Sequence, residues 1–120
     1  MRVSKIKLNI PISLGELVDK LTILEIKIEK FTDEEKLKEV NLERGHLKKI
    51  YNSVEKDKKV LDDFKSELKK INSKLWNIED SIRILEINKD FGENFIQLAR
   101  SVYFTNDERF DVKNKINIHF

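Results

Sequence analysis

Cysteine is absent from this 120-residue chain, which has only three glycines and one proline. Without cysteine there is no disulfide framework, no thiolate nucleophile and no cysteine-based metal site. So few glycines and prolines leave little of the chemistry that forms turns, and a mainly helical fold is therefore expected. No apolar run approaches the length of a membrane span, and the segment Met1–Lys5 lacks the apolar core of a signal peptide. We expect a cytoplasmic protein.

An excess of one charge is also lacking. The 24 basic and 22 acidic residues nearly balance, which leaves a net charge of +2. Most basic residues are lysine, which argues against nucleic-acid recognition, where the arginine guanidinium is favoured. Lysines gather at 56–59 and on the N-terminal arm, but no aromatic residues are interleaved with them, so a solvated surface is the simpler interpretation. With 39% hydrophobic and 38% charged residues, the chain is too apolar for disorder and too charged for a large α/β core.

A long apolar seam is the most informative feature that is present. Its members alternate in spacing between three and four positions, with no glycine or proline between them. That pattern is typical of a long helix that buries one stripe against partner helices. The seam comprises Leu61, Phe64, Leu68, Ile71, Leu75, Ile78, Ile82 and Leu85.

The start of the first helix is marked by two signals. Ser13 followed by Glu16 forms a capping box, and Ile12 and Leu17 around it form a hydrophobic staple. We predict a helix over 14–31. Apolar residues occupy two of its faces, which is typical of a helix with two neighbours, so we expect this helix inside the bundle.

Capping signals divide the rest of the chain, and a polar stretch at 52–59 interrupts the apolar pattern. We interpret that stretch as the turn of a long antiparallel, coiled-coil-like hairpin, slender at the turn and thicker at its other end. The alternative is one helix over 33–89, roughly 85 Å long, which is out of proportion to a domain of this size. The predicted helices after the first are 33–53, 57–89, 91–104 and 106–117.

The two ends of the chain alternate between apolar and polar residues. Residues 1–12 are therefore predicted to form an extended arm or a short strand, and Pro11 keeps the end of that strand off a central ladder. Residues 116–120 either pair with the arm as a strand or form a frayed helix end. Together these patterns predict a single, mostly α-helical domain over residues 1–120, built as a helical bundle with an N-terminal arm.

Polar residues cluster where the bundle is predicted to be thickest. Asp80 shares a helix face with Trp76 and Arg83, and further polar residues follow on the next helix. A buried Arg–Asp network that fixes helix register is the simplest interpretation, because buried charges need partners. The other interpretation is a pocket in which Arg83, Arg100 and Arg109 grip an anionic ligand. The candidate residues are Trp76, Asp80, Arg83, Arg100, Tyr103, Asn106, Asp107 and Arg109.

Four carboxylates are weak candidates for binding Mg²⁺. Glu25 and Glu29 lie one turn apart on the first helix, and Glu79 and Asp80 lie on the third. In a chain with 22 acidic residues such pairs arise by chance, and nearby lysines offer them partners. We therefore expect neither a metal nor another cofactor.

Three stretches resemble a known family. They are PISLGELVDKLTILEIK at 11–27, LWNIEDSIR at 75–83 and FIQLARSVYFTNDER at 95–109. Together they resemble a small uncharacterised helical family, a domain of unknown function that occurs in bacteria and phages, alone or near or fused to glycosyltransferase and tetratricopeptide-repeat proteins. The resemblance covers nearly the whole chain but implies no known activity, cofactor or catalytic residue. The glycosyltransferases that occur near or fused to the family hint at a role in surface-sugar metabolism. The chain departs from the family at 116–120, where a longer helical tail is expected.

No catalytic constellation is recognisable, so the leading hypothesis is a non-enzymatic interaction or oligomerisation module. A thin helical hairpin leaves apolar edges that a second copy or another helical protein would cover, and we predict a homodimer. Neither a membrane nor a nucleic acid is expected as a partner. The alternative is a small helical enzyme or ligand-binding domain that acts on an anionic metabolite of the sugar or nucleotide class.

Overall fold

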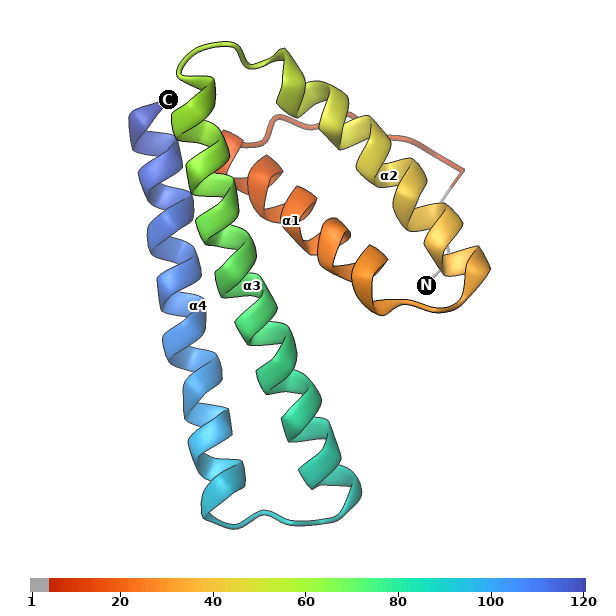
Figure 1. Ribbon diagram of the computed structural model, residues 1–120, viewed down its shortest axis with the longest axis vertical. Helices are drawn as coiled ribbons and strands as arrows, with labels where there is room; N and C mark the ends of the chain where they lie inside the picture. The colour runs from red at the N-terminus through yellow and green to blue at the C-terminus, as the bar shows by residue number, and fades with distance from the viewer. Residues whose placement is uncertain (1–4) are drawn as a thin grey trace.

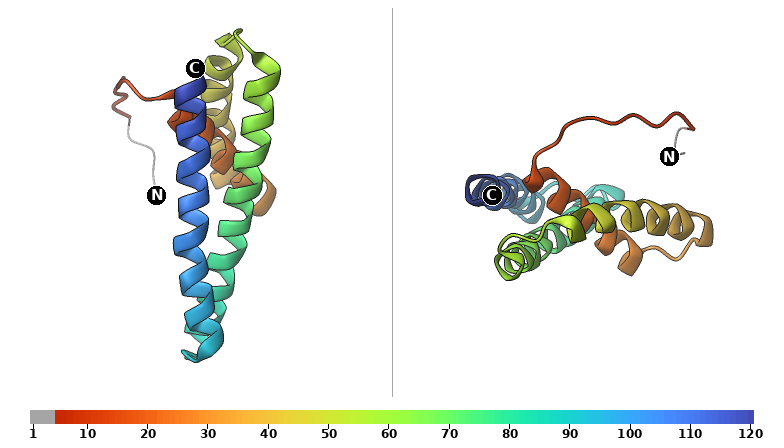
Figure 2. Two further views of the ribbon diagram at one scale, coloured as in Figure 1. Left: turned by 90° about the vertical axis from the view of Figure 1, so that its left-hand side faces the viewer. Right: turned by 90° about the horizontal axis from the view of Figure 1, so that it is seen from above.

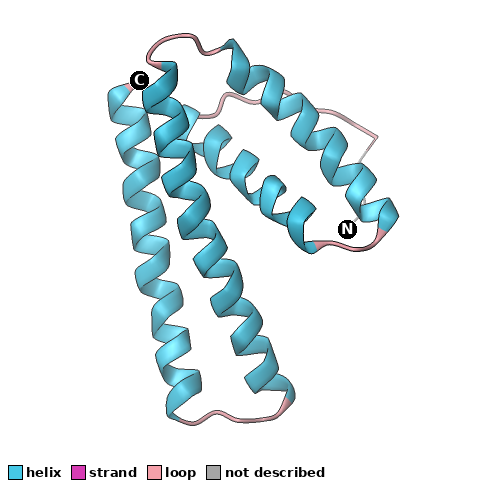
Figure 3. Ribbon diagram, viewed as in Figure 1, coloured by secondary structure: helices cyan, strands magenta, loops and turns pink. Residues whose placement is uncertain are grey.

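A computed structural model describes residues 5–120 and contains, over that range, four helices and no strand (Figures 1 and 3). The helices are α1 (Leu14–Lys30), α2 (Glu34–Ser53), α3 (Lys58–Ile87) and α4 (Glu93–His119). The prediction of an all-α fold is confirmed. Within the described range, none of these helices combines the length and apolar character needed to cross a bilayer.

The central helix of the bundle is α1, which packs against α2, α3 and α4. Its position inside the bundle was predicted from its two apolar faces. Ser13 caps the helix as expected, because its side-chain oxygen accepts a hydrogen bond from the backbone N–H of Glu16 at 3.2 Å. The Glu16 carboxylate forms an ion pair with Lys113 of α4. The first turn of α1 is therefore bound to the C-terminal part of α4.

The long helix pair is formed by α3 and α4, and the predicted hairpin of the second and third helices is wrong. The two helices lie side by side and are joined by the turn at 88–92 (Figures 1 and 2). α2 instead packs on α1, and residues 54–57 carry the chain from one helix pair to the other. Apolar periodicity gives each helix a face to bury but does not say which helix covers it.

The bundle is thick around the first half of α3 and thin toward the α3–α4 turn, which is the reverse of the prediction. Leu61 and Leu68 belong to the hydrophobic core. None of residues 76–104 is buried, because α1 and α2 lie beside only the other end of the α3–α4 pair (Figure 1). Ile84 and Ile87, in the half of α3 where thicker packing was predicted, are 58% and 79% exposed. The end of the pair projects from the bundle.

A single continuous helix, α4, occupies the region where the sequence predicted two helices, over 91–104 and 106–117. Thr105 is buried, and the Arg109 side chain is held by Asp19 of α1. These tertiary contacts override the low helix propensity of the Thr-Asn-Asp sequence at this point.

Neither end of the described chain forms the strand that the sequence left open as an alternative. Residues 5–12 form an exposed arm without regular secondary structure, and residues 1–4 of the predicted arm lie outside the described range. The strand considered for 116–120 does not form, because α4 continues to His119 and buries Ile116 in the core.

Candidate functional site

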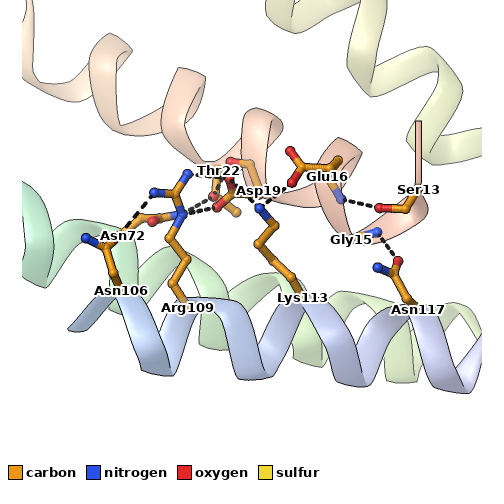
Figure 4. A network of polar contacts seen from close by, with 10 residues as sticks. All are labelled: Ser13, Gly15, Glu16, Asp19, Thr22, Asn72, Asn106, Arg109, Lys113 and Asn117. Atoms are coloured by element: carbon orange, nitrogen blue, oxygen red, sulfur yellow. Dashed lines mark hydrogen bonds and ion pairs between the residues drawn. The ribbon is translucent and has the colours of Figure 1, made fainter. Parts of the chain in front are cut away.

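A polar network lies where α1 crosses α3 and α4, and its centre is an ion pair between Asp19 of α1 and Arg109 of α4 (Figure 4). Arg109 Nε donates to Asp19 Oδ1 at 2.8 Å, and Arg109 Nη2 donates to Asp19 Oδ2 at 2.5 Å. Asp19 is 2% exposed and the Arg109 side chain 27% exposed. One guanidinium therefore engages both carboxylate oxygens, which is the strongest geometry for such a pair.

Asn72 of α3 and Thr22 of α1 complete the interior of the network. Asn72 Nδ2 donates to Asp19 Oδ1 at 2.9 Å and to Thr22 Oγ1 at 3.0 Å. The Thr22 hydroxyl in turn donates to the backbone oxygen of Asp19 at 2.8 Å. Because Asn72 and Thr22 are both buried, these hydrogen bonds satisfy groups that water does not reach.

Lys113 of α4 extends the network toward the start of α1. Its Nζ forms an ion pair with Glu16 and lies 3.7 Å from Asp19 Oδ2. One turn further along α4, Asn117 Oδ1 accepts a hydrogen bond from the backbone N–H of Gly15 at 2.8 Å. This backbone N–H is one of those that the first turn of a helix leaves without an intrahelical partner. α4 supplies the missing acceptor.

The two helices approach each other most closely at Gly15. A Cβ atom added to Gly15 would lie 2.6 Å from the backbone oxygen of Lys113 and 2.9 Å from Asn117 Oδ1. The absence of a side chain at Gly15 therefore permits the hydrogen bond to Asn117 and sets the distance between α1 and α4.

The electrostatics of the network follow from burial and pairing. Burial alone would raise the pKa of Asp19, but hydrogen bonds from Arg109 and Asn72, with the charges of Arg109 and Lys113, outweigh it and lower the pKa below the ordinary value of 3.8. The hydrogen bond to Asp19 raises the pKa of Arg109 against the opposing effect of burial. Both groups are charged at neutral pH. The network is therefore a joint that fixes α4 on α1, and its ionic groups are already engaged within the protein.

The predicted site residues are not brought together in one place. Asp80 is exposed and pairs within α3, where its Oδ1 lies 3.6 Å from Nη1 of Arg83. Arg100 and Arg109 are nine positions apart on α4, which places them on opposite faces and about 13 Å apart along the helix axis. A buried Arg–Asp pair does exist, but its carboxylate comes from Asp19.

The remaining predicted residues have separate surroundings. The ring of Trp76 packs against Phe31 at the end of α1, with 6.2 Å between ring centroids. Asn106 Oδ1 accepts a long hydrogen bond of 3.5 Å from Arg109 Nη1, at the edge of the network. Tyr103 is 67% exposed, and Asp107 is exposed without an ion pair to any of residues 5–120.

The four carboxylates considered as weak metal candidates do not form one site. Glu25 and Glu29 of α1 pair with Lys65 and Lys69 of α3, at 2.7 and 2.8 Å. In the part of the chain that the structure describes, no three carboxylate or histidine side chains converge as a metal site would require.

A second polar cluster surrounds Tyr51, which is fully buried near the end of α2. Its hydroxyl donates to Asp62 Oδ1 at 2.5 Å, and Lys58 Nζ lies 3.8 Å from the centroid of its ring. Burial and the hydrogen bond to Asp62 raise the pKa of Tyr51 well above its usual range. Tyr51 thereby links α2 to α3 across the loop at 54–57.

Sequence reasoning missed most of the network, namely Asp19, Thr22, Asn72 and Lys113. A signal for two of them was present. Asp19 follows Leu17 and Val18 on a helix with two apolar faces, and Asn72 follows Ile71 within the apolar seam of α3. Polar residues beside apolar stripes on two different helices indicate a buried contact between those helices.

The exposed side of α4 carries an apolar stripe opposite the network. Ile96, Tyr103 and Phe110 are seven positions apart, so they share one face, and they are 48%, 67% and 66% exposed. Arg100 and Asp107 lie between them on the same face. We call these five residues the outer face of α4.

A groove of about 490 Å³ lies between α3 and α4 at the projecting end of this helix pair, on a side of α4 different from the outer face. It combines an apolar floor with hydroxyl and amide groups. Its lining residues are Ser81, Ile84, Leu85, Asn94, Gln97, Leu98 and Ser101.

Comparison with known proteins assigns the chain to a family. A family model described as a family of unknown function, DUF6165, matches residues 8–120, so the chain belongs to this family. This confirms the resemblance to an uncharacterised domain family. Neither the curated proteins nor the solved structures contain a significant match.

Proposed function

We propose that this member of the DUF6165 family is a non-enzymatic protein-interaction and oligomerisation module. Its contact surface is the outer face of α4, presented along the projecting α3–α4 pair. The cytoplasmic location expected from a cysteine-free sequence belongs to the same proposal.

The observation that carries this proposal is the exposure of large apolar side chains at heptad spacing. Ile96, Tyr103 and Phe110 leave about half or more of their surface in contact with water, and large apolar side chains gathered on one exposed face are typical of an interaction surface. Apolar residues that recur every seven positions on one helix face are typical of a surface covered by another helix. The stripe therefore favours a helical protein partner.

The polar network supports the same proposal from the opposite side of α4. Asp19, which also accepts a hydrogen bond from Asn72, holds Arg109 on the inner face, and Gly15 allows the close approach of the helix. A helix fixed in this way presents its outer face without reorganising, and that lowers the entropic cost of binding.

The anion-binding or enzymatic alternative has less support. Its three arginines do not converge, and Asp19 already neutralises Arg109. A thermal-shift screen with anionic metabolites tests it, because a ligand that binds only the folded state raises the melting temperature.

The proposed function is tested by measuring mass in solution by light scattering as the concentration is varied. We expect the wild-type chain to form a complex of twice the single-chain mass at tens of micromolar. Tyr103→Lys combined with Phe110→Lys places charge on the outer face and should shift the mass to that of one chain. Leu42→Lys is the matched control, because Leu42 is similarly exposed, at 65%, but lies on α2. A single-chain mass for the wild type at 100 µM would overturn self-association.

A further inference from the structure

We propose that the partner is a second copy of this chain, and that the two outer faces of α4 pack antiparallel about a two-fold axis between Tyr103 and Phe104. In this arrangement Arg100 of each copy pairs with Asp107 of the other. The inference rests on the proposed function and gives it a partner and a register.

The charges on the outer face are the first reason. Arg100 and Asp107 are two turns apart on one face of α4 and carry opposite charges. Within the described chain, neither forms an ion pair. The Arg100 guanidinium lies over the ring of Phe104, 5.9 Å from the ring centroid. A face with one unpaired cation and one unpaired anion is complementary to an inverted copy of itself.

The direction of the second copy follows from that pattern. A parallel copy in register would place arginine against arginine and aspartate against aspartate. An antiparallel copy centred between Tyr103 and Phe104 places Arg100 opposite Asp107 twice, because both lie three and a half positions from the axis. Such an interface uses the same patch on both subunits and closes on itself as a dimer.

The apolar residues fit the same axis. Ile96 lies seven and a half positions before the axis and Phe110 six and a half positions after it, so each faces the other across the interface. Tyr103 of one copy lies beside Tyr103 and Phe104 of the other. The register that pairs the charges therefore also covers the apolar stripe, and these two requirements come from different side chains.

The surface is accessible for this packing. In the left view of Figure 2, α4 runs in front of the other helices, and no other described helix covers it along its length. The arm at residues 5–12 leaves to one side of α4 in that view.

Introduced cysteines test the register directly, since the natural chain has none. Helices packed 8–10 Å apart bring facing Cα atoms to within roughly 6 Å, which permits a disulfide. Tyr103→Cys should therefore form a covalent dimer on mild oxidation. Ile96→Cys should not, because the two copies of residue 96 would lie about 22 Å apart along the axis. A mixture of Ile96→Cys and Phe110→Cys chains should form a covalent heterodimer.

Charge reversal provides an independent readout by sedimentation equilibrium. Arg100→Glu should weaken dimerisation about tenfold, because it creates two like-charge contacts. The double variant Arg100→Glu with Asp107→Arg should restore it. Lys70→Glu, at an exposed site on α3, changes the net charge by the same amount as Arg100→Glu and is the control.

The outcomes separate the two proposals. A dimer in which Ile96→Cys crosslinks to itself, or in which the double charge variant is not restored, overturns the antiparallel register and leaves the oligomerisation module intact. A wild-type chain that remains a monomer overturns both the second copy as partner and the proposed self-association.

Discussion

Asp19 and Arg109 stand ninety positions apart in the chain and form a two-point ion pair in which both carboxylate oxygens accept from one guanidinium. The pair joins the first helix to the last, and Asn72 adds a contact from the third. It lies on the inner side of α4, while the proposed contact surface lies on the outer side. Stability and interaction are therefore predicted to depend on different faces of one helix.

Asp19→Asn should destabilise the fold strongly. It leaves the guanidinium of Arg109 partly buried without a counter-charge, and the loss of one partner from a buried pair costs roughly 3 kcal/mol. The free energy of unfolding from urea titration measures the effect. Asp80→Asn is the control, because the exposed pair with Arg83 should contribute less than about 0.5 kcal/mol. Equal effects of the two variants would contradict the role assigned to the network.

Acidification should remove the contribution of Asp19. The folded-state pKa of Asp19 is lowered below 3.8, so the unfolded chain binds its proton first as the pH falls. The stabilisation is complete above about pH 5 and is lost as the pH falls through the folded-state pKa. We expect the difference in unfolding free energy between wild type and Asp19→Asn to narrow below pH 4. If the difference in unfolding free energy between wild type and Asp19→Asn stays constant down to pH 2.5, protonation of Asp19 does not cause the loss of stability.

Tyr51→Phe should cost about 1 kcal/mol, because the hydrogen bond to Asp62 is lost while the Asp62 carboxylate can still be hydrated. The packing of the ring is kept. The midpoint of unfolding in urea measures the effect. The proposed role of Tyr51 in linking α2 to α3 fails if its hydroxyl can be removed with no change in the unfolding midpoint.

The helices could be predicted from the sequence because their signals are local. Ser13 caps α1 as expected, and Leu61 and Leu68 of the predicted seam lie in the core. The packing partners could not be predicted in the same way. Nothing local distinguishes α2 from α4 as the neighbour of α3, since both carry apolar stripes.

The network was missed for the same reason. Asp19, Asn72 and Arg109 meet only once three helices are packed, and pairing over ninety positions leaves no local trace. The sequence did predict a buried Arg–Asp pair, and Arg109 was among the predicted site residues. It assigned Asp80 as the carboxylate because Asp80 and Arg83 share a helix face, and local spacing is all that a single sequence supplies.

Gly15 and Gly45 offer a matched test of how closely α1 and α4 pack. Both lie within helices, and alanine is intrinsically the better helix former by about 0.8 kcal/mol. At Gly45 nothing lies within 4 Å of the added Cβ, so Gly45→Ala should stabilise the fold by about that amount. At Gly15 the new Cβ would lie 2.6 Å from the backbone oxygen of Lys113. Backbone cannot move aside as a flexible side chain can, so Gly15→Ala should destabilise the fold by about 2 kcal/mol. Urea unfolding of the two variants should shift in opposite directions, and a stabilising Gly15→Ala would mean that α4 can move away from α1 without loss of the network.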